Sequence, residues 1–261
     1  MDLRHGDCLQ ILKDISSNSV DLVICDLPFG CLAQETRVVA NPANNHRKEQ
    51  PPTERAGCAW DIPIDLDAFW TEIRRIRRND HTPCIHFCTT KYGFELYESN
   101  KKEFRYDLVW NKERGVSFLA ANKMPMRSHE MVYVFSKAGA YYNRIDISGD
   151  FPEWNRGLDS RHGGIYGSIP RTNPAGGNGT RCVLSVIDVL KKTVRGHHPT
   201  EKPVELYKFL IERYCPSGGT VLDPTFGSGN SGLAARQLHR KYIGIEKDEG
   251  YFKKFKDKVG L

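Results

Sequence analysis

The sequence predicts an α/β fold in which helices cover a mostly parallel β-sheet, and three observations lead to this fold class. Four short apolar segments each run into a loop or a helix, as strands of a parallel sheet do. Two further segments, 105–110 and 130–135, are predicted to pair antiparallel at the far edge of the sheet. The length of 261 residues suits one domain, 1–261, with insertions or a small lobe.

The four parallel strands are predicted at residues 20–25, 83–88, 220–223 and 241–246. An apolar helix is expected before the second strand, another after the third, and a lysine-rich helix after the fourth. The apolar positions of the first two helices include Phe69, Trp70, Ile73, Ile76, Leu233, Ala234 and Leu238.

Composition limits the classes of protein to consider. No apolar run approaches the roughly 18 residues of a membrane span, and the polar N-terminus does not resemble a signal peptide. We therefore expect an intracellular protein, cytoplasmic or nucleoid-associated, whose eight cysteines are free thiols. No Cys-x-x-Cys pair is present, so no metal site is predicted. The net charge of +6 suits a polyanionic partner, but the excess is modest.

Two long segments lack the pattern of regular structure. Residues 31–60 are polar and rich in Pro, Asn and Arg, and residues 150–180 mix many glycines with Arg and aromatic residues. Loops of this length in a compact domain are usually functional or disordered. We expect 31–60 to be a flexible loop.

The strongest local pattern follows the third strand, where an acid leads into a glycine-rich turn and a helix. The segment is Asp223, Pro224, Thr225, Phe226, Gly227, Ser228, Gly229 and Asn230. Glu246 ends the next strand, 23 residues after Asp223, where a carboxylate could accept hydrogen bonds from ribose hydroxyls. The alternative is an ordinary turn with a solvated acid. Because the third glycine of a dinucleotide site and the Lys-Ser/Thr of a triphosphate site are missing, a different adenosine-bearing cofactor is expected.

A second pattern, Asp26-Leu27-Pro28-Phe29, follows the first strand. The carboxylate of Asp26 and the carbonyl of Leu27 could accept the two N–H hydrogens of an aromatic amine. Phe29 could stack on the extruded ring while Pro28 fixes the turn. This arrangement would free the nitrogen lone pair for attack on a methyl sulfonium. Taken alone, however, the pattern is typical of an ordinary turn.

A third pattern, Thr200-Glu201-Lys202-Pro203, opens an apolar helix. Thr200 is predicted as its N-cap, and Pro203 belongs in a first turn. Lys202 could pair with a carboxylate, although a lysine at a helix entry is usually solvated.

Together and in this order, the three patterns closely resemble the β-class amino-methyltransferases of DNA. In that family an Asp-Pro-Pro-Tyr loop comes first, a target-recognition segment follows, and Thr-x-Lys-Pro and Asp-Pro-Phe-x-Gly-Ser-Gly motifs come last. The resemblance is loose over 3–135 and tight over 197–255. It implies a Rossmann-like, AdoMet-dependent methyltransferase fold with circularly permuted motif order, an antiparallel edge and inserted recognition loops.

Carried over residue by residue, the resemblance assigns S-adenosylmethionine (AdoMet) as the cofactor. Asp223 and the turn through Gly229 would hold its methionine portion, with Lys202 near its carboxylate. Glu246 would bind the ribose, and Asp7, which is followed by Cys8, would bind the adenine amine. Leu27 and Phe29 depart from the family's Pro and Tyr, but a backbone acceptor and a stacking ring remain.

The resemblance makes duplex DNA the expected partner and adenine N6 the favoured target, because an acid opens the reactive loop; cytosine N4 stays open. The segment 136–195 is predicted to recognise sequence, and a homodimer is possible. Basic residues suited to DNA are Arg74, Arg75, Arg77, Arg78, Lys112, Arg114, Lys123, Arg127, Arg156, Arg161 and Arg171. The alternatives are methylation of RNA or single-stranded DNA, or a DNA- or AdoMet-binding protein without catalysis.

Overall fold

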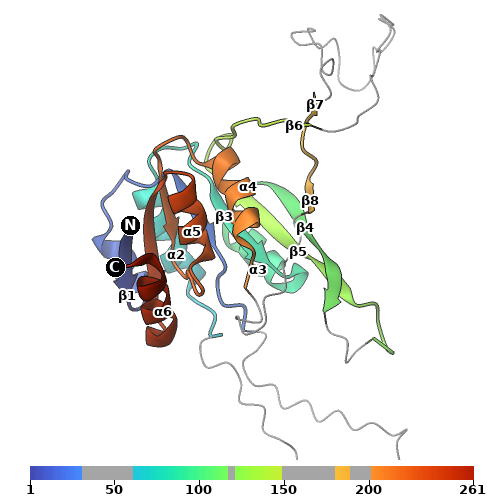
Figure 1. Cartoon of the computed structure of the whole chain (residues 1–261), viewed down its shortest axis with the longest axis horizontal. Coiled ribbons are helices and arrows are strands. Elements are labelled where there is room, and N and C mark those ends of the chain that lie inside the picture. Colours follow the sequence, from blue (N-terminus) through green and yellow to red (C-terminus); the bar gives the residue numbers. More distant parts are fainter. Residues whose placement is uncertain (31–60, 117–120, 149–179, 189–200) are drawn as a thin grey trace, which may run out of the picture.

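The computed structural model describes residues 1–30, 61–116, 121–148, 180–188 and 201–261. An eight-stranded sheet forms its centre, in the order β1-β10-β9-β2-β3-β5-β4-β8 (Figure 1). Its strands are β1 Asp2–His5, β2 Leu22–Cys25, β3 Cys84–Cys88, β4 Phe104–Val116, β5 Arg127–Phe135, β8 Val186–Asp188, β9 Thr220–Asp223 and β10 Lys241–Glu246. A second, two-stranded sheet pairs β6 (Ile147–Ser148) with β7 (Thr180–Arg181).

The parallel part of the sheet contains all four strands predicted for it. β10, β9, β2 and β3 lie side by side and run parallel, and β1 adds a fifth parallel strand at the edge. The prediction did not include β1, which brings the first residues of the chain beside the last strand. The carboxyl ends of these strands therefore meet at one edge of the sheet, where open α/β sheets bind ligands.

The antiparallel pair is also confirmed, but its position differs from the prediction. β5 runs antiparallel to both β3 and β4, and β8 then pairs parallel with β4. The short strand β8 thus forms the far edge of the sheet, and β4 lies inside it. Three residues with only two apolar side chains give too little pattern to predict a strand from sequence.

Helices cover both faces of the sheet and complete the three layers of the domain (Figure 1). Their bounds are α1 Cys8–Ile11, α2 Leu66–Ile76, α3 Thr90–Asn100, α4 Val204–Tyr214, α5 Asn230–Gln237 and α6 Glu249–Val259, with a 3-10 turn at Leu12–Asp14. Alternate residues of each strand face opposite layers: Leu22 and Ile24 pack with α4 and α5, whereas Val23 and Cys25 pack with α1 and α2. Period-2 alternation therefore builds two apolar cores.

The predicted start of α4 is wrong by several residues. The helix begins at Val204 with Pro203 at its N-cap, so Lys202 lies in the extended entry, and Thr200 lies outside the described residues. A proline restricts the preceding residue to extended backbone, which delays the helix. No helix within the described ranges is long and apolar enough to cross a membrane.

The inserted loops are described only in part. The predicted flexible loop 31–60 lies outside the described residues, as do 149–179 and 189–195 of the predicted recognition segment. Of that segment, β6, β7 and β8 are described, and β8 joins the main sheet. The recognition role of 136–195 stays a prediction.

Candidate active site

A cavity of about 550 Å³ opens at the carboxyl edge of the parallel strands. Residues that follow β1, β2, β9 and β10 line it together with the entry to α4. The lining includes these predicted site residues: Asp7, Cys8, Asp26, Pro28, Lys202, Pro224, Thr225, Phe226, Gly227, Ser228 and Glu246. The fold thus brings together residues from the first quarter and the last quarter of the chain.

Asp223 supports the glycine-rich turn from below rather than facing the cavity. Its side chain is buried and accepts hydrogen bonds from the Thr225 N–H (3.0 Å) and the Ser231 hydroxyl (2.6 Å). Burial raises the pKa of Asp223 to about 7. Gly229 also lies outside the lining: it has φ +78°, and a Cβ there would meet the Phe255 ring at 2.0 Å. Only glycine fits this close approach.

Glu246 is the acid at the end of β10, and it is tied to the turn. Its carboxylate accepts hydrogen bonds from the N–H groups of Gly227 and Asp248, both at 2.8 Å. Burial raises the pKa of Glu246 above its ordinary value. Because a carboxylate offers about four lone-pair sites, acceptor capacity remains for a ligand's hydroxyls.

Asp7 caps the first helix at the same end of the cavity. Its carboxylate accepts a hydrogen bond from the Leu9 N–H (3.0 Å) and lies 3.2 Å from the Lys247 ammonium. The Gly6 N–H donates to the Glu246 carbonyl (2.9 Å), which fixes this loop against β10. The N-terminal segment and Glu246 thereby share one wall.

Asp26 and Lys202 form an ion pair across the cavity floor. Lys202 is 3% exposed at its side chain and Asp26 is 25% exposed. Burial raises the pKa of Asp26 above its ordinary value, and Lys202 opposes this shift. Burial alone would lower the pKa of Lys202, but Asp26 and Glu130 raise it above its ordinary value. Lys202, expected beside a cofactor carboxylate, is thus bonded to the first residue of the reactive loop.

The rest of that loop is held by packing and by an acid that the sequence did not single out. Leu27 is buried in the core, and the Phe29 ring lies against Tyr92 at 4.9 Å between centroids. Asp61 Oδ1 accepts hydrogen bonds from the N–H groups of Phe29 (2.7 Å) and Gly30 (3.0 Å). Asp61 lies 32 positions after Phe29, so no local pattern pointed to it.

Other lining residues, which were not predicted from the sequence, come from the segment before α2, from α4, from the loop after β10 and from α6. Ile62, Pro63, Ile64, Asp65, Tyr207, Asp248 and Tyr251 also line the cavity. Tyr207 lies on α4, the helix that was predicted only as apolar. Leu27, Phe29, Asp223, Gly229 and Asn230 were predicted as site residues but are not part of the lining; Asn230 instead donates to the Lys202 carbonyl at 2.8 Å.

Two thiols and an imidazole form a buried cluster beside the reactive loop. Within the described ranges, the Sγ atoms of Cys25 and Cys84 and a ring nitrogen of His86 all lie within 4.8 Å of one another. The sequence missed this group because its members come from the adjacent strands β2 and β3. The His86 ring packs against Phe69, Trp70 and Phe135, which gives it a role in the apolar core.

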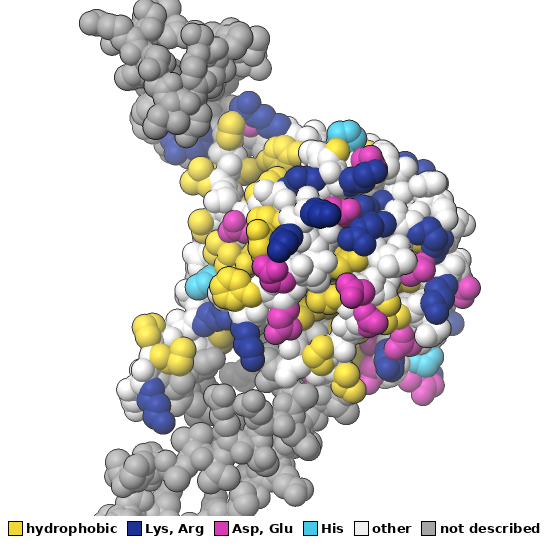
Figure 2. All heavy atoms as spheres, turned by 180° about the vertical axis from the view of Figure 1, so that it is seen from behind, with side chains coloured by type: hydrophobic (Ala, Val, Ile, Leu, Met, Phe, Trp, Pro, Cys, Tyr) yellow, Lys and Arg dark blue, Asp and Glu magenta, His cyan; other side chains and the backbone are white. Residues whose placement is uncertain are grey.

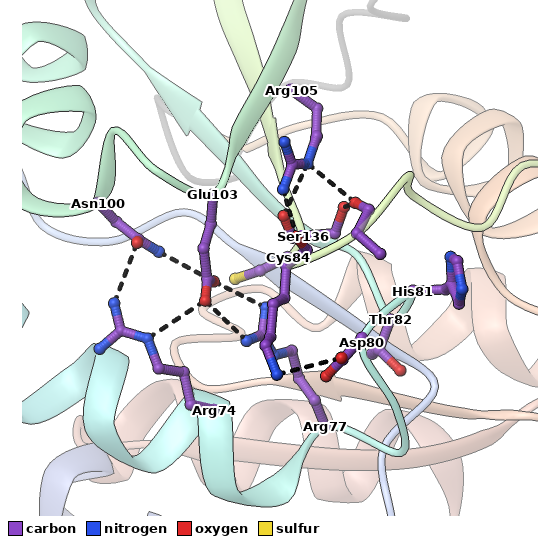
Figure 3. Close-up of polar contacts among 12 residues, drawn as sticks. Arg74, Arg77, Asp80, His81, Thr82, Cys84, Asn100, Glu103, Arg105 and Ser136 are labelled. Atoms are coloured by element: carbon purple, nitrogen blue, oxygen red, sulfur yellow. Dashed lines mark hydrogen bonds and ion pairs between the residues drawn. The ribbon is translucent and has the colours of Figure 1, made fainter.

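The arginines of the basic cluster take part in a network of ion pairs and hydrogen bonds, and their contact with DNA stays a prediction. The guanidinium of Arg77 is buried and donates to both oxygens of Glu103 (2.9 and 3.1 Å), and Arg74 reaches Glu103 and Asn100 (Figure 3). Arg78 pairs with Asp21 and Arg75 with Glu72. The Arg77–Glu103 ion pair joins the end of α2 to the residue before β4. The local run of arginines could not reveal this contact.

Of the remaining basic residues expected to contact DNA, some bond within the protein and others lie outside the described residues. Lys112 pairs with Glu130 at 2.7 Å, Arg127 bonds Thr90, and Arg156, Arg161 and Arg171 lie outside the described residues. Figure 2 shows basic and acidic side chains interspersed on one face of the molecule rather than a single basic surface.

The comparisons with known proteins show the family of the chain. The model of a DNA methylase family matches residues 20–257. Type II methyltransferase M.HindIII of Haemophilus influenzae is 39% identical over 293 aligned residues, covering 99% of this chain and 95% of that protein. The chain belongs to this DNA methylase family. Type II methyltransferase M.XycI of Xanthomonas campestris pv. cyanopsidis is 33% identical over 147 residues, covering 56% of this chain but only 41% of that relative's length.

Two solved structures share the fold. The M1.HpyAVI-SAM complex aligns with TM-score 0.63 at 18% identity, covering 99% of this chain and 98% of that chain. The cytosine-N4-specific PvuII DNA methyltransferase aligns with TM-score 0.62 at 17% identity, covering 96% and 83%. This likeness confirms the predicted fold class.

Proposed function

We propose that the protein transfers a methyl group from AdoMet to the exocyclic amine of a DNA base, with adenine N6 favoured. The observation that carries this proposal is the position of Asp26. Its carboxylate lines the same cavity as Glu246 and the glycine-rich turn, so an amine acceptor and an adenosine-type crevice share one space. Family membership and the SAM complex of M1.HpyAVI support the choice of cofactor.

The cavity offers groups suited to each part of AdoMet. Glu246 would accept from the ribose hydroxyls, Asp7 would accept from the adenine amine, and the turn from Thr225 to Ser228 would lie beside the methionine portion. When bound, AdoMet would supply an electrophilic methyl group on its sulfonium. Lys202 is already paired with Asp26, so we assign it to that acid rather than to the cofactor carboxylate.

The chain's own part in catalysis is to bind and aim the amine. The Asp26 carboxylate and the Leu27 carbonyl would accept the two N–H hydrogens, which turns the nitrogen lone pair away from ring conjugation. Phe29 would stack on the extruded base. As the new N–C bond forms and the C–S bond breaks, one amine proton becomes acidic, and the ionised Asp26 carboxylate can take it.

The target base is the finer part of the proposal. The acid at the start of the loop favours adenine N6, as in the adenine members that the sequence resembles. The PvuII enzyme is cytosine-N4-specific, and its similar fold shows that this architecture also serves cytosine. The oxygens of Asp26 and Leu27 could hold either amine.

The test compares wild type with Asp26→Asn and, as a matched control, Asp67→Asn in the first turn of α2. Each would be incubated with AdoMet labelled in its methyl group and unmethylated duplex DNA, single-stranded DNA or RNA. We expect transfer to duplex DNA by wild type and Asp67→Asn, and loss of transfer by Asp26→Asn with AdoMet binding retained. Faster transfer to RNA or to single-stranded DNA than to duplex DNA would correct the proposed substrate. Binding of AdoMet without transfer to any of them by the wild type would support the non-catalytic alternative.

The role of 136–195 in sequence recognition and the formation of a homodimer remain part of the proposal. Exchanging that segment for the corresponding segment of a relative should change the methylated sequence. An unchanged methylated sequence would assign recognition elsewhere.

A further inference from the structure

A line of alternating charges leads from the reactive loop into the antiparallel part of the sheet. Asp26 pairs with Lys202, the Lys202 ammonium lies 3.5 Å from Glu130 Oε2, and the Lys112 ammonium lies 2.7 Å from Glu130 Oε1. The exposed fractions of the Lys202, Lys112 and Glu130 side chains are 3%, 13% and 21%. Buried charges are costly unless paired, so this line needs an explanation.

Lys202 is held at its side chain and at its backbone. Its ammonium lies 4.8 Å from the centroid of the Phe87 ring, and its carbonyl accepts a hydrogen bond from Asn230 Nδ2 at 2.8 Å. Glu130, on β5, is not among the residues that line the cavity. It therefore acts on the site through its charge, by its ion pair with Lys202 and by repulsion of the Asp26 carboxylate.

We propose that Lys202 and Glu130 are positioning residues for methyl transfer: Lys202 holds the Asp26 carboxylate ionised and oriented, and Glu130, restrained by Lys112, sets how strongly Lys202 acts. This inference rests on the proposed function, because it takes Asp26 as the acceptor of the amine hydrogens. Only an ionised carboxylate accepts with both oxygens, and a protonated one would be able to donate. The Lys202 ammonium paired with Asp26 favours the ionised form, against the effect of burial.

The two residues act on Asp26 with opposite signs. Burial raises the pKa of Asp26, Lys202 lowers it, and Glu130 raises it. Removing Lys202 should therefore raise the pKa of Asp26, and removing the charge of Glu130 should lower it. The ionisable groups that interact with Asp26 from the surrounding elements are Lys202, Glu130, Asp61, Cys88, Tyr92, Tyr207 and Asp223.

The expected effect appears in the pH profile of transfer. The rate should rise with pH as Asp26 ionises, so the acid limb of the profile follows its pKa. An opposite charge at this range typically lowers a carboxyl pKa by about 1–3 units. For Lys202→Met the limb should move upward by about that amount, a rate loss of about 10- to 1,000-fold at acid pH. For Glu130→Gln it should move downward.

The experiment measures single-turnover methyl transfer from saturating labelled AdoMet to unmethylated duplex DNA over the acid and neutral pH range. Lys112→Met provides a milder variant in case Lys202→Met does not fold. The acid limb of its pH profile should move to higher pH, by less than in Lys202→Met. Glu249→Gln and Lys253→Met make the same changes in an exposed ion pair on α6 and serve as matched controls. Calorimetry should give AdoMet affinities within about twofold of wild type for Glu130→Gln.

The inference is supported if the acid limb moves to higher pH in Lys202→Met, or in Lys112→Met, and to lower pH in Glu130→Gln. A loss of folding alone would lower the rate without moving the limbs in opposite directions. Displacements of the same sign, or none in any variant, would overturn the inference. If wild type transfers no methyl group to duplex DNA while Asp26→Asn is equally inert, the proposed function fails instead, so the two failures are distinguishable.

Discussion

Replacing Glu246 by Gln should weaken AdoMet binding while leaving the fold in place. The side chain has the same length, but it loses its charge and one of its two acceptor oxygens. In the structure each carboxylate oxygen accepts a backbone N–H, from Gly227 and from Asp248, at 2.8 Å. The Gln amide can satisfy only one of them, and its NH₂ group would face the other N–H.

The magnitude follows from these contacts. A hydrogen bond to a charged group contributes about 1.5–3 kcal/mol, and Glu246 is expected to make such bonds to the ribose hydroxyls. The loss of one corresponds to a Kd increase of about 10- to 150-fold, because about 1.4 kcal/mol equals tenfold. The turn at Gly227 should loosen as well, which acts in the same direction.

Isothermal titration calorimetry with AdoMet measures the effect directly. Glu249→Gln, three residues along the chain, is the matched control because its side chain is 65% exposed and pairs only with the surface residue Lys253 among the contacts described. Thermal unfolding of both variants shows whether the fold is retained. An unchanged Kd for a folded Glu246→Gln would refute the assignment of this acid to the ribose.

Three further predictions concern stability. Glu103→Gln should lower the free energy of unfolding by about 3–5 kcal/mol, because it leaves the buried Arg77 guanidinium without its counter-charge. Denaturant titration measures this loss, and a loss under about 1 kcal/mol would contradict the prediction. Gly229→Ala should prevent stable folding, because its Cβ would overlap the Phe255 ring; a native-like melting temperature would contradict the packing. Burial raises the pKa of Asp223 from 3.8 to about 7. The unfolded state therefore loses this proton at lower pH than the folded state does, and the free energy of unfolding should fall as pH rises between these values. Urea titrations across that range should show the fall in wild type and a flatter dependence in Asp223→Asn.

The parallel strands were predictable because each is a buried apolar segment, as for 22–25 and 84–88, where every residue is buried. Runs of this kind identify central strands without knowledge of their neighbours. The antiparallel strands β4 and β5 are only partly buried, and they were predictable because each contains a short apolar segment, 108–110 and 131–135. β1 was missed because its pattern, Asp-Leu-Arg-His, is mostly polar, and only its partner β10 makes it a strand.

Most of the candidate site was predictable as a set of residues, but its internal contacts were not. Motif order placed Asp26, Lys202 and Glu246 at strand ends or at a helix entry, yet nothing local showed that Lys202 would pair with Asp26, 176 positions away. The arginines at the C-terminal end of α2 show the limit of a local pattern. A run of like charges suggested a DNA surface, whereas Arg77 is buried by a partner that only the fold reveals.

The proposed reaction is methylation of an exocyclic amine of a base in duplex DNA. The most direct measurement incubates the purified protein with labelled AdoMet and unmethylated duplex DNA, digests the DNA to nucleosides and identifies the product by mass spectrometry. We expect N6-methyladenine, formed by wild type and absent with Asp26→Asn. N4-methylcytosine would keep the mechanism and correct the base. A methyl group on a ring carbon, or equal product from Asp26→Asn, would contradict the account.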